Sequence, residues 1–456
     1  MRRTEKLISK MKEMVGEAHL LKDSDRLKSF RIDGKRPKVV IYPATTEEVS
    51  KIVAYAFDQT LTIIPMGNGT KIEIGNIPKK VDILLSTQRL NRITDCDCDN
   101  LTLTAESGIT LREVQKRLAK EGRGYFIPMD PPFTEKATLG GIVATNSSGP
   151  RRYMYGTARD LVIGTKAVFP NGDIVVSGGK TVKNVSGYDM SKLLIGSYGT
   201  LGILCEMTFK LLPIPEKEAT LLIPFVRLED GDAFVQEIIG SQLLPSSIET
   251  LNRSAVRRLN HPVSLPREAN YLIAIGLDGV GESIEREISE LTERGKKYQS
   301  LDPWVLHSEE HQSFWSALRD FAGSLKEGRT SFLSFKSNVL ISKGGEVMKS
   351  YEEMINQRGM EGAFISRSGN GILYSYLFPG RNLRSKMESL IELIQKLTSE
   401  AVKNEGNMIV ETAPSILKKR ISVWGETRPE YQVMRRLKEQ IDPKGIFSPG
   451  RFLGGI

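Results

Sequence analysis

The sequence predicts an α+β protein with two or three domains. Three observations support this: 456 residues can bury more than one apolar core, strand-like and helix-like segments alternate over the first 130 residues, and a period-2 pattern follows them. No apolar run reaches the roughly 20 residues that span a bilayer, and the N-terminus lacks the continuous apolar stretch of a signal peptide. We therefore expect a soluble, cytoplasmic protein.

A strand–helix–strand pattern occurs twice after an N-terminal helix. The first thirty-odd residues carry apolar side chains at helical spacing and predict a packing helix, with Leu7, Ile8, Met11, Met14 and Val15 on one face. Strands at 39–42 and 61–64 then flank a helix that a capping box, Thr45 to Glu48, begins. Strands at 101–105 and 125–127 flank a second helix with a box from Thr110 to Glu113. Two βαβ-like units are predicted before residue 130.

The pattern changes from residue 161. Strands at 161–169 and 174–177 flank Pro170-Asn-Gly-Asp173, which is a strong hairpin signal and favours a mixed sheet over a purely parallel one. Pro213-Ile-Pro215 marks a domain boundary near residue 215. Beyond it, strands (219–225, 271–275, 334–341) alternate with long charged helices (282–298, 384–404), so we expect antiparallel strands backed by helices.

Charge and cysteine content exclude several classes of function. The formal net charge is +9, but the basic residues are scattered and not interleaved with aromatic ones. Nucleic acid is therefore not expected, and an acidic partner protein, an anionic substrate or an anionic membrane surface fits better. The three cysteines are one short of the four thiolates of a usual iron–sulfur cluster. Cys96 and Cys98 lie among aspartates, which repel thiolates, so an exposed turn is expected there and not a metal site.

Three glycine-rich segments predict a site for a dinucleotide. A pyrophosphate needs backbone N–H donors that no Cβ obstructs, and glycine supplies both close approach and positive φ angles. The loop Pro65-Met-Gly-Asn-Gly-Thr70 follows a strand, and taken alone it would fit a plain β-turn better than a binding loop. Residues 130–150, and then 185–189 with 196–203, repeat its small and hydroxyl side chains. The G-x-G-x-x-G fingerprint with an acidic residue about twenty positions on is missing, which disfavours a Rossmann NAD site.

These segments resemble the FAD-linked oxidases, the family of glycolate oxidase subunits, D-lactate dehydrogenases and alkyl-dihydroxyacetone-phosphate synthase, over nearly the whole chain. The resemblance implies the two-subdomain FAD-binding fold of the p-cresol methylhydroxylase type plus an α+β cap domain with an antiparallel sheet. The implied parts are a helical segment 1–34, an FAD-binding domain 35–215, a cap or substrate domain 216–405, and a C-terminal segment 406–456 that returns to the FAD domain. That last segment holds Ile441-Asp-Pro-Lys-Gly-Ile-Phe-Ser-Pro-Gly-Arg-Phe452, which is similar to the family's closing motif.

The resemblance also implies which residues contact FAD. In the family, the loop like 65–71 wraps the pyrophosphate, the stretches like 130–138 and 145–148 lie along the flavin and ribityl chain, and the segment like 198–204 closes on the cofactor. The implied contacts are Pro65, Met66, Gly67, Asn68, Gly69, Thr70, Lys71, Asp130, Pro131, Thr138, Leu139, Gly140, Gly141, Thr145, Asn146, Ser147, Ser148, Gly149, Tyr155, Gly199, Thr200, Gly202 and Ile203. Covalent members have a histidine beside the first loop or a cysteine near the second segment. Here the histidines (His19, His261, His307, His311) lie elsewhere, so FAD should bind non-covalently.

The second domain departs from the family. Catalytic hydroxy-acid dehydrogenases have a metal and substrate motif resembling H-x-G-D-G-N-x-H, where this chain reads Ser366-Arg-Ser-Gly-Asn-Gly-Ile-Leu-Tyr374. Their Glu-His-Gly element corresponds to Asn404-Glu-Gly-Asn-Met-Ile-Val-Glu411. Without these histidines we expect no metal site, and no catalytic residue is identified. Arg367, Asn370 and Tyr374 either line a residual substrate pocket or surround a simple β-turn at 368–371.

In lacking these histidines, the chain resembles the smaller FAD-binding subunit of glycolate oxidase. That subunit pairs with a larger catalytic FAD subunit and an iron–sulfur subunit. Val410-Glu-Thr-Ala-Pro414 and Val423-Trp-Gly425 are also similar to that subunit. The resemblance implies an FAD-dependent oxidoreductase acting on glycolate or D-lactate and passing electrons to an iron–sulfur or quinone-linked partner, with at most peripheral contact with the inner membrane. Two alternatives stay open: a non-catalytic FAD scaffold or electron relay, and an independent dehydrogenase of another small hydroxy acid.

Overall fold

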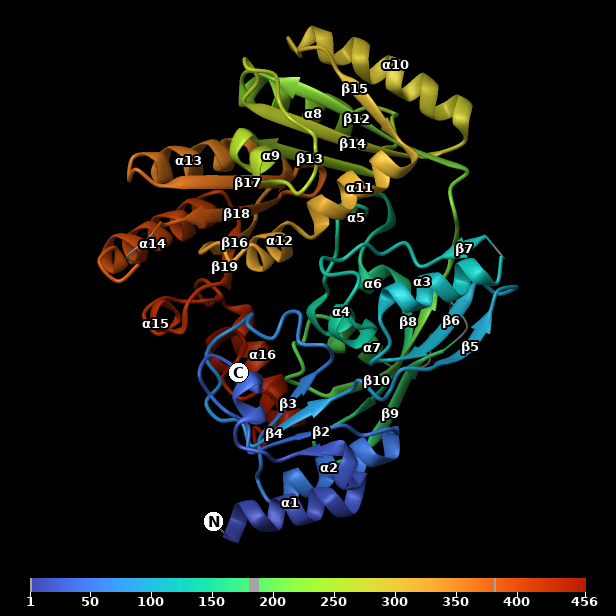
Figure 1. Cartoon of the computed structure of the whole chain (residues 1–456), viewed down its shortest axis with the longest axis vertical. Helices are drawn as coiled ribbons and strands as arrows, with labels where there is room; N and C mark the ends of the chain where they lie inside the picture. The colour runs from blue at the N-terminus through green and yellow to red at the C-terminus, as the bar shows by residue number, and fades with distance from the viewer. Residues whose placement is uncertain (1, 123, 180–187, 381–382) are drawn as a thin grey trace. The chain divides into compact units, whose positions relative to one another are not determined.

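The chain forms two compact units. The computed structural model describes residues 2–122, 124–179, 188–380 and 383–456 (Figure 1), so residues 185–187 of the third glycine segment lie outside the described residues. Unit 1 comprises Met1–Ser148, Gly156–Ile214 and Thr427–Ile456, and unit 2 comprises Gly149–Tyr155 and Pro215–Glu426. The C-terminal segment expected at 406–456 is divided at residue 427, because strand β19 (Asn407–Thr412) pairs with β16 (Leu333–Asn338) in the sheet of unit 2.

The first sheet of unit 1 has the strand order β1–β2–β4–β3. Strands β2 (Val39–Ile41) and β3 (Ile63–Met66) run parallel to β4 (Ile83–Ser86), and β1 (Leu20–Leu21) is antiparallel to β2. Helices α1 (Arg2–Val15) and α2 (Thr46–Asp58) bury their apolar faces in one cluster with these strands. Helix α1 is shorter than expected, because Gly16 has φ +81° and ends it before the 3₁₀ turns η1 (Glu17–His19) and η2 (Arg26–Phe30).

Both predicted helix caps form, but only half of each capping box does. Thr45 Oγ1 accepts from the Glu48 N–H at 3.1 Å, while the Glu48 carboxylate accepts from the Ala44 N–H, one residue before the cap. At the start of α3 (Leu111–Lys120), the Glu113 N–H donates to the cap hydroxyl of Thr110, and the Glu113 carboxylate pairs with Arg117 one turn on. The N-caps are confirmed, but neither glutamate carboxylate accepts a hydrogen bond from the backbone N–H of its cap residue.

The second sheet of unit 1 is antiparallel, in the order β5–β6–β10–β8–β9. Its strands are β5 (Ile93–Asp97), β6 (Thr102–Glu106), β10 (Ile203–Lys210), β8 (Val162–Val168) and β9 (Ile174–Gly178). The hairpin predicted around 170–173 is confirmed by the β8–β9 pairing. The second βαβ-like unit is wrong: β6 already has β5 and β10 on its two edges, so β7 (Tyr125–Phe126) pairs instead with β11 (Leu212–Pro213).

The turn between β5 and β6 is less exposed than predicted. Asp99 and Asn100 face solvent, whereas Cys98 is only 5% exposed and belongs to the apolar cluster beneath the second sheet. Cys96 is partly buried against the same cluster. The prediction of an exposed turn is therefore wrong for the Cys98 side chain, because it packs inward.

Short helices and the C-terminal segment complete unit 1. The helices are α4 (Leu139–Thr145), α6 (Ala158–Leu161), α7 (Met190–Leu194), α16 (Glu430–Ile441) and the 3₁₀ turn η5 (Leu453–Gly455). After α16 the chain passes beside β3: the Ile63 N–H donates to Ile446 O at 2.8 Å, and the Ser448 N–H donates to Ile63 O at 2.9 Å. Phe447 is fully buried in the cluster under α1 and α2.

Unit 2 contains an eight-stranded antiparallel sheet, as predicted, in the order β15–β12–β14–β13–β17–β18–β16–β19 (Figure 1). The strands not yet given are β12 (Lys217–Phe225), β13 (Ser247–Asn252), β14 (Tyr271–Gly279), β15 (Trp304–His307), β17 (Glu361–Arg367) and β18 (Ile372–Phe378). One face packs against α8 (Leu228–Ile239), α10 (Gly281–Lys297), α13 (Gly344–Asn356) and α14 (Met387–Lys403). The other packs against α9 (Arg253–Arg258), α11 (Ser308–Arg319) and α12 (Phe321–Glu327). The short helices α5 (Arg152–Tyr155) and α15 (Ser415–Lys418) and the 3₁₀ turns η3 (Ile341–Lys343) and η4 (Ser368–Asn370) also belong to unit 2.

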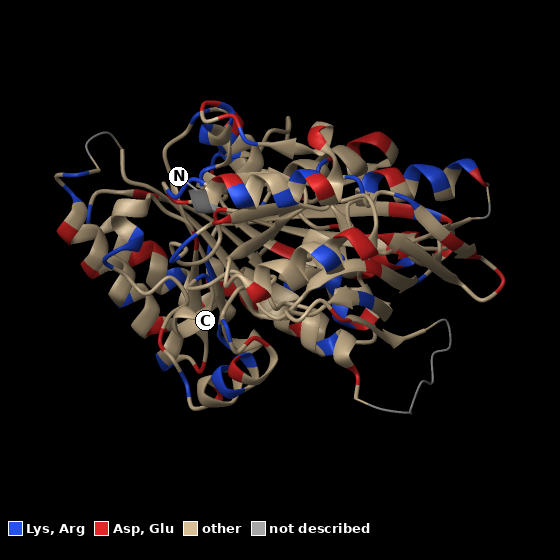
Figure 2. Ribbon diagram, turned by 90° about the horizontal axis from the view of Figure 1, so that it is seen from below, with Lys and Arg blue, Asp and Glu red and all other residues tan. Residues whose placement is uncertain are grey.

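Charged residues of both signs are interspersed along the helices, as Figure 2 shows. The charge is not gathered on one element, in agreement with its scattered distribution in the sequence. Among the helices in the described ranges, none is long and apolar enough to cross a bilayer.

A buried ion pair holds the C-terminal segment in unit 1. Lys438 Nζ donates to Asp442 Oδ2 at 2.6 Å and to the main-chain oxygens of Thr200 and Phe447 at 2.7 and 3.0 Å. The Asp442 carboxylate also accepts from the N–H groups of Ile446 and Phe447. Burial lowers the pKa of Lys438, and the charge of Asp442 opposes that shift. Removing one partner would leave the other charge buried and unpaired.

Asp442→Ala should therefore destabilise unit 1 by about 3–5 kcal/mol, the usual cost of breaking a buried pair. Urea denaturation measures the change. The matched control is Glu439→Ala on α16, the helix that ends just before Asp442; it removes an exposed i,i+4 pair with Arg435 at 2.9 Å and should change stability little. Equal effects of the two substitutions would contradict the role given to the buried pair.

Candidate functional site: a cleft in unit 1 and a polar stripe in unit 2

Unit 1 contains a cleft with an empty volume of about 1040 Å³. Its walls come from the loop after β3, from α4, from the segment leading into β10 and from the C-terminal segment. Most of the residues predicted to bind a cofactor line it: Pro65, Met66, Gly67, Asn68, Gly69, Thr70, Lys71, Thr138, Gly140, Gly141, Thr145, Ser147, Gly199, Gly202 and Ile203. Three segments distant in sequence thus meet around one space.

The other predicted contacts do not line this cleft in the described part of the chain. Asp130, Pro131, Leu139, Asn146, Ser148 and Thr200 lie in unit 1, and Gly149 and Tyr155 belong to unit 2. Leu139 is fully buried in the apolar cluster of the second sheet, which explains its position away from the cleft. The Tyr155 hydroxyl donates to Asp278 Oδ2 at 2.9 Å, within unit 2.

Several lining residues were not among the predicted contacts: Ile64, Ile72, Ile74, Thr87, Ser107, Pro132, Ala137, Ile142, Ala144, Ser197, Tyr198, Leu204, Ser448 and Arg451. Ser107 follows β6 directly and precedes Gly108, so a small-residue pair after a strand was a usable signal. Ser448 and Arg451 lie in the closing motif, and Tyr198 begins the closing segment. The apolar residues carry no local signal, because their packing depends on the tertiary fold.

The loop after β3 presents backbone donors that no other described residue uses. Within the described residues, the N–H groups of Gly67, Asn68, Gly69 and Thr70 donate no hydrogen bond to another residue. The Asn68 side chain fixes the loop, since its Nδ2 donates to Lys136 O at 2.9 Å. Consecutive N–H groups of this kind form an anion-binding site, and each bond to a charged phosphate oxygen is worth about 1.5–3 kcal/mol.

Glycine is required where the three segments meet. A Cβ at Gly67 would lie 2.1 Å from Thr138 Oγ1, the atom that accepts from the Gly141 N–H and caps α4. A Cβ at Gly199, where φ is +65°, would lie 2.4 Å from Pro65 Cγ. The backbones therefore approach without side chains between them, which leaves room for an elongated ligand.

Two cations border the cleft. Lys71 Nζ donates to Ser147 Oγ. Arg451 Nη2 donates to the main-chain oxygens of Ile72 and Ile74 at 2.6 and 2.5 Å. Burial lowers the pKa of Arg451 to about 10, so it remains a cation at neutral pH. Positive side chains beside free backbone donors fit the charge of a dinucleotide diphosphate, and no histidine or cysteine lines the cleft in the described part of the protein.

Unit 2 carries a second candidate site, which we call the polar stripe: Glu249, Arg367, Tyr374 and Lys336. Antiparallel pairing sets Glu249 opposite Arg367 and Tyr374 opposite Lys336, so all four point to the sheet face that bears α9, α11 and α12. Arg367 Nε lies 3.5 Å from Glu249 Oε1, with both side chains under 10% exposed, and its guanidinium lies over the Tyr374 ring at 4.7 Å.

The charges around Lys336 perturb its titration. Burial, together with the nearby cations Arg367 and Arg152, lowers the pKa of Lys336 to about 8, against the opposing effect of Glu411. Burial raises the pKa of Tyr374 to about 12, so its hydroxyl stays protonated at neutral pH. An amine that titrates near neutrality beside fixed guanidinium groups can bind an anion or accept a proton.

The sequence identified part of this stripe. Arg367 and Tyr374 were among the residues considered for a residual substrate pocket, while Asn370 lies in η4, a 3₁₀ turn between β17 and β18 in place of the β-turn considered for 368–371. Lys336 was missed, although a lone lysine in the strand pattern Phe332-Leu-Ser-Phe-Lys-Ser-Asn338 was a signal for it. Glu249 and Arg152 come from distant segments, and only the tertiary fold brings them near.

The chain matches two known families. Residues 37–178 match the FAD binding domain, and residues 214–452 match the C-terminal domain of FAD linked oxidases. The chain is 30% identical to a D-lactate dehydrogenase of Archaeoglobus fulgidus over 418 residues, covering 91% of this chain and 90% of that protein. It is 28% identical to glycolate oxidase subunit GlcD of Bacillus subtilis, covering 91% of this chain and 88% of that protein.

The fold has solved relatives as well. A structure of p-cresol methylhydroxylase superposes with a TM-score of 0.76, covering 98% of this chain and 96% of that one, at 16% identity. This likeness concerns the fold and confirms the predicted architecture. The free backbone donors of the cleft and the match to the FAD binding domain and its relatives agree. FAD is therefore the cofactor. The chain belongs to the FAD-linked oxidase family and is an FAD-dependent oxidoreductase of the kind that includes GlcD and D-lactate dehydrogenase.

Proposed function

We propose that this protein oxidises a small 2-hydroxy acid, D-lactate or glycolate, to the 2-oxo acid. The observation that carries the proposal is the polar stripe of unit 2, where Lys336 lies opposite Tyr374 on the sheet face that also carries the Arg367–Glu249 pair. The names of the similar proteins, a D-lactate dehydrogenase and a glycolate oxidase subunit, support the same substrate class.

The reaction has three requirements, and the side chains of the polar stripe meet two of them. Oxidation removes a hydride from the carbon that bears the hydroxyl and a proton from that hydroxyl, and the substrate carboxylate needs a counter-charge. When bound, FAD accepts the hydride. The guanidinium groups of Arg367 and Arg152 pair with the carboxylate, and the neutral amine of Lys336 accepts the hydroxyl proton. Tyr374, protonated at neutral pH, donates a hydrogen bond that orients the substrate.

The cleft of unit 1 holds FAD through the predicted contacts. The free N–H groups of residues 67–70 bind the diphosphate, with Lys71 supplying positive charge. The described lining contains no histidine or cysteine, which supports non-covalent binding of the cofactor.

The electrons leave through a partner. Three cysteines cannot supply the four thiolates of a usual iron–sulfur cluster, so an acceptor of that kind requires another chain. We place this chain as an FAD-binding subunit beside a larger flavin subunit and an iron–sulfur or quinone-linked subunit, with peripheral contact with the inner membrane through those partners. The word subunit in the name of the Bacillus subtilis relative supports an assembly.

The purified flavoprotein, mixed anaerobically with D-lactate or glycolate, should lose its flavin absorbance without any partner present. Stopped-flow spectroscopy measures the rate, and L-lactate serves as a stereochemical control for the first substrate. A flavin that stays oxidised with every 2-hydroxy acid would overturn the proposal in favour of the non-catalytic scaffold or relay.

Lys336→Met should lower kcat/KM by about 10²–10⁴-fold, the usual contribution of a positioned base. The amine is protonated below about pH 8 and neutral above it, so the wild-type rate should rise with pH through this region. The variant should lose that rising limb. Lys396→Met on α14, whose side chain is 55% exposed, is the control and should keep both rate and profile. An unchanged pH profile in Lys336→Met would exclude Lys336 as the base.

Gly67→Ala should weaken FAD binding at least about tenfold, or about 1.4 kcal/mol, because the new Cβ displaces Thr138 and the loop donors with it. The affinity is measured by titrating apoprotein with FAD and following flavin fluorescence. Gly279→Ala is the control, since a Cβ there meets no atom within 4 Å. Equal FAD affinity in the two variants would show that the loop does not bind the diphosphate.

A further inference from the structure

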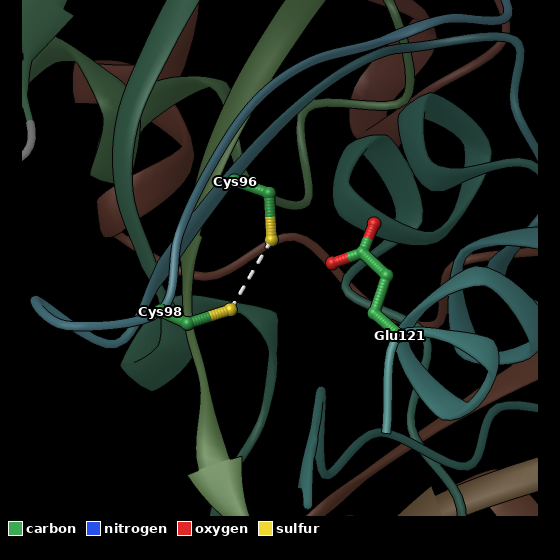
Figure 3. Close-up of side chains that lie close together, drawn as sticks. All are labelled: Cys96, Cys98 and Glu121. Atoms are coloured by element: carbon green, nitrogen blue, oxygen red, sulfur yellow. Dashed lines mark hydrogen bonds between the residues drawn. The ribbon is translucent and has the colours of Figure 1, made fainter. Parts of the chain in front are cut away.

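Two thiols and a carboxylate converge at one end of the second sheet of unit 1, away from the residues that line the cleft. Cys96 Sγ and Cys98 Sγ lie 3.5 Å apart, and a carboxylate oxygen of Glu121 completes a group whose three atoms lie within 4.8 Å of one another (Figure 3). The thiols come from the end of β5 and the turn after it, and the carboxylate comes from the residue that follows α3.

The backbone explains why these groups meet. Residues i and i+2 of an extended segment point to the same side, so the C-x-C spacing sets both thiols on one face. The Asp97 carboxylate accepts from the backbone N–H and the side-chain amide of Asn100, which fixes the turn beneath them. Glu121 is exposed and its side chain is free to rotate toward the sulfurs, whereas Cys98 is nearly buried. The arrangement combines two constrained ligands with one adjustable ligand.

The distances suit a tetrahedral cation. A Zn–S bond of about 2.3 Å and a tetrahedral angle separate two thiolate ligands by about 3.8 Å, close to the distance found here. Asp95, Asp97 and Asp99 flank the thiols and add negative potential, which opposes free thiolates but favours a bound divalent cation. The partial negative charge at the C-terminus of α3 acts in the same direction.

We propose that Cys96, Cys98 and Glu121 bind one Zn²⁺ ion, with a water molecule as the fourth ligand. The site is independent of flavin chemistry. Two thiols lose their protons as two Zn–S bonds form, so binding releases two protons and strengthens as the pH rises. The ion would join the β5–β6 turn to the end of α3 and stabilise that corner of unit 1.

The test uses the FAD-loaded protein with its cysteine thiols reduced and any bound metal removed by a chelator. Equilibrium dialysis against Zn²⁺ should give one ion per chain, and the melting temperature should rise with Zn²⁺. Cys96→Ser and Cys98→Ser should each weaken binding by at least about 100-fold, and Glu121→Gln by about tenfold. Titration with Cd²⁺ should produce thiolate-to-metal absorption in the wild type and in Glu121→Gln, and lose it in the serine variants.

Asp99→Asn is the matched control, because it removes an exposed carboxylate beside the site and should leave the stoichiometry unchanged. The FAD content of each variant reports that it has folded, and Glu121→Gln alters only an exposed side chain. Absence of Zn²⁺ binding by the reduced wild type would overturn the proposal. Wild-type affinity in Cys96→Ser, or binding that persists after the two thiols are oxidised to a disulfide, would overturn it as well.

Discussion

The cofactor cleft depends on a close approach of backbones. The loop after β3 reaches α4 and the segment before β10 only because no Cβ stands at Gly67 or Gly199. The same approach leaves the loop N–H groups without partners inside the described chain, a cost that an anionic ligand removes. Strand β3 positions the loop, and Thr138, the N-cap of α4, contacts it. The second sheet packs against α4 and holds that helix in place.

In unit 2, charged side chains lie on the face of a sheet that is otherwise largely apolar. Its residues 366–374 lack the histidines of the motif that they resemble, and they supply a guanidinium and a phenol instead. A guanidinium is a fixed positive charge, whereas the pKa of Lys336 is lowered to about 8 by burial and by the neighbouring cations. We propose that these two side chains divide the work of holding an acid and moving its proton, without a metal ligand set.

Predictions that rested on local signals were reliable, and competition between distant segments of the fold explains the failures. The hairpin around 170–173 and the N-caps Thr45 and Thr110 depend on neighbouring residues alone, and all three form. The second βαβ-like unit failed because β6 has both edges taken by strands that the local pattern does not reveal. For the cleft, the glycine loops were predicted from their chemistry, but apolar lining residues such as Ile72 and Ile142 carry no local signal and reach the cleft only through the tertiary fold. Lys336 gave a local signal, a charge within an apolar strand, that was not used.

The strap formed by the C-terminal segment has a consequence for biosynthesis. Arg451 donates to the carbonyls of Ile72 and Ile74, and Phe447 fills the core beneath α1 and α2. The surroundings of the first sheet are therefore completed only by residues that are synthesised after all of unit 2. During synthesis, the N-terminal half therefore leaves the ribosome before the residues that close one side of its nucleotide pocket have been made. Such a nascent chain would depend on chaperones or on the early folding of unit 2 to protect its apolar core, and flavin capture would be a late, post-translational event.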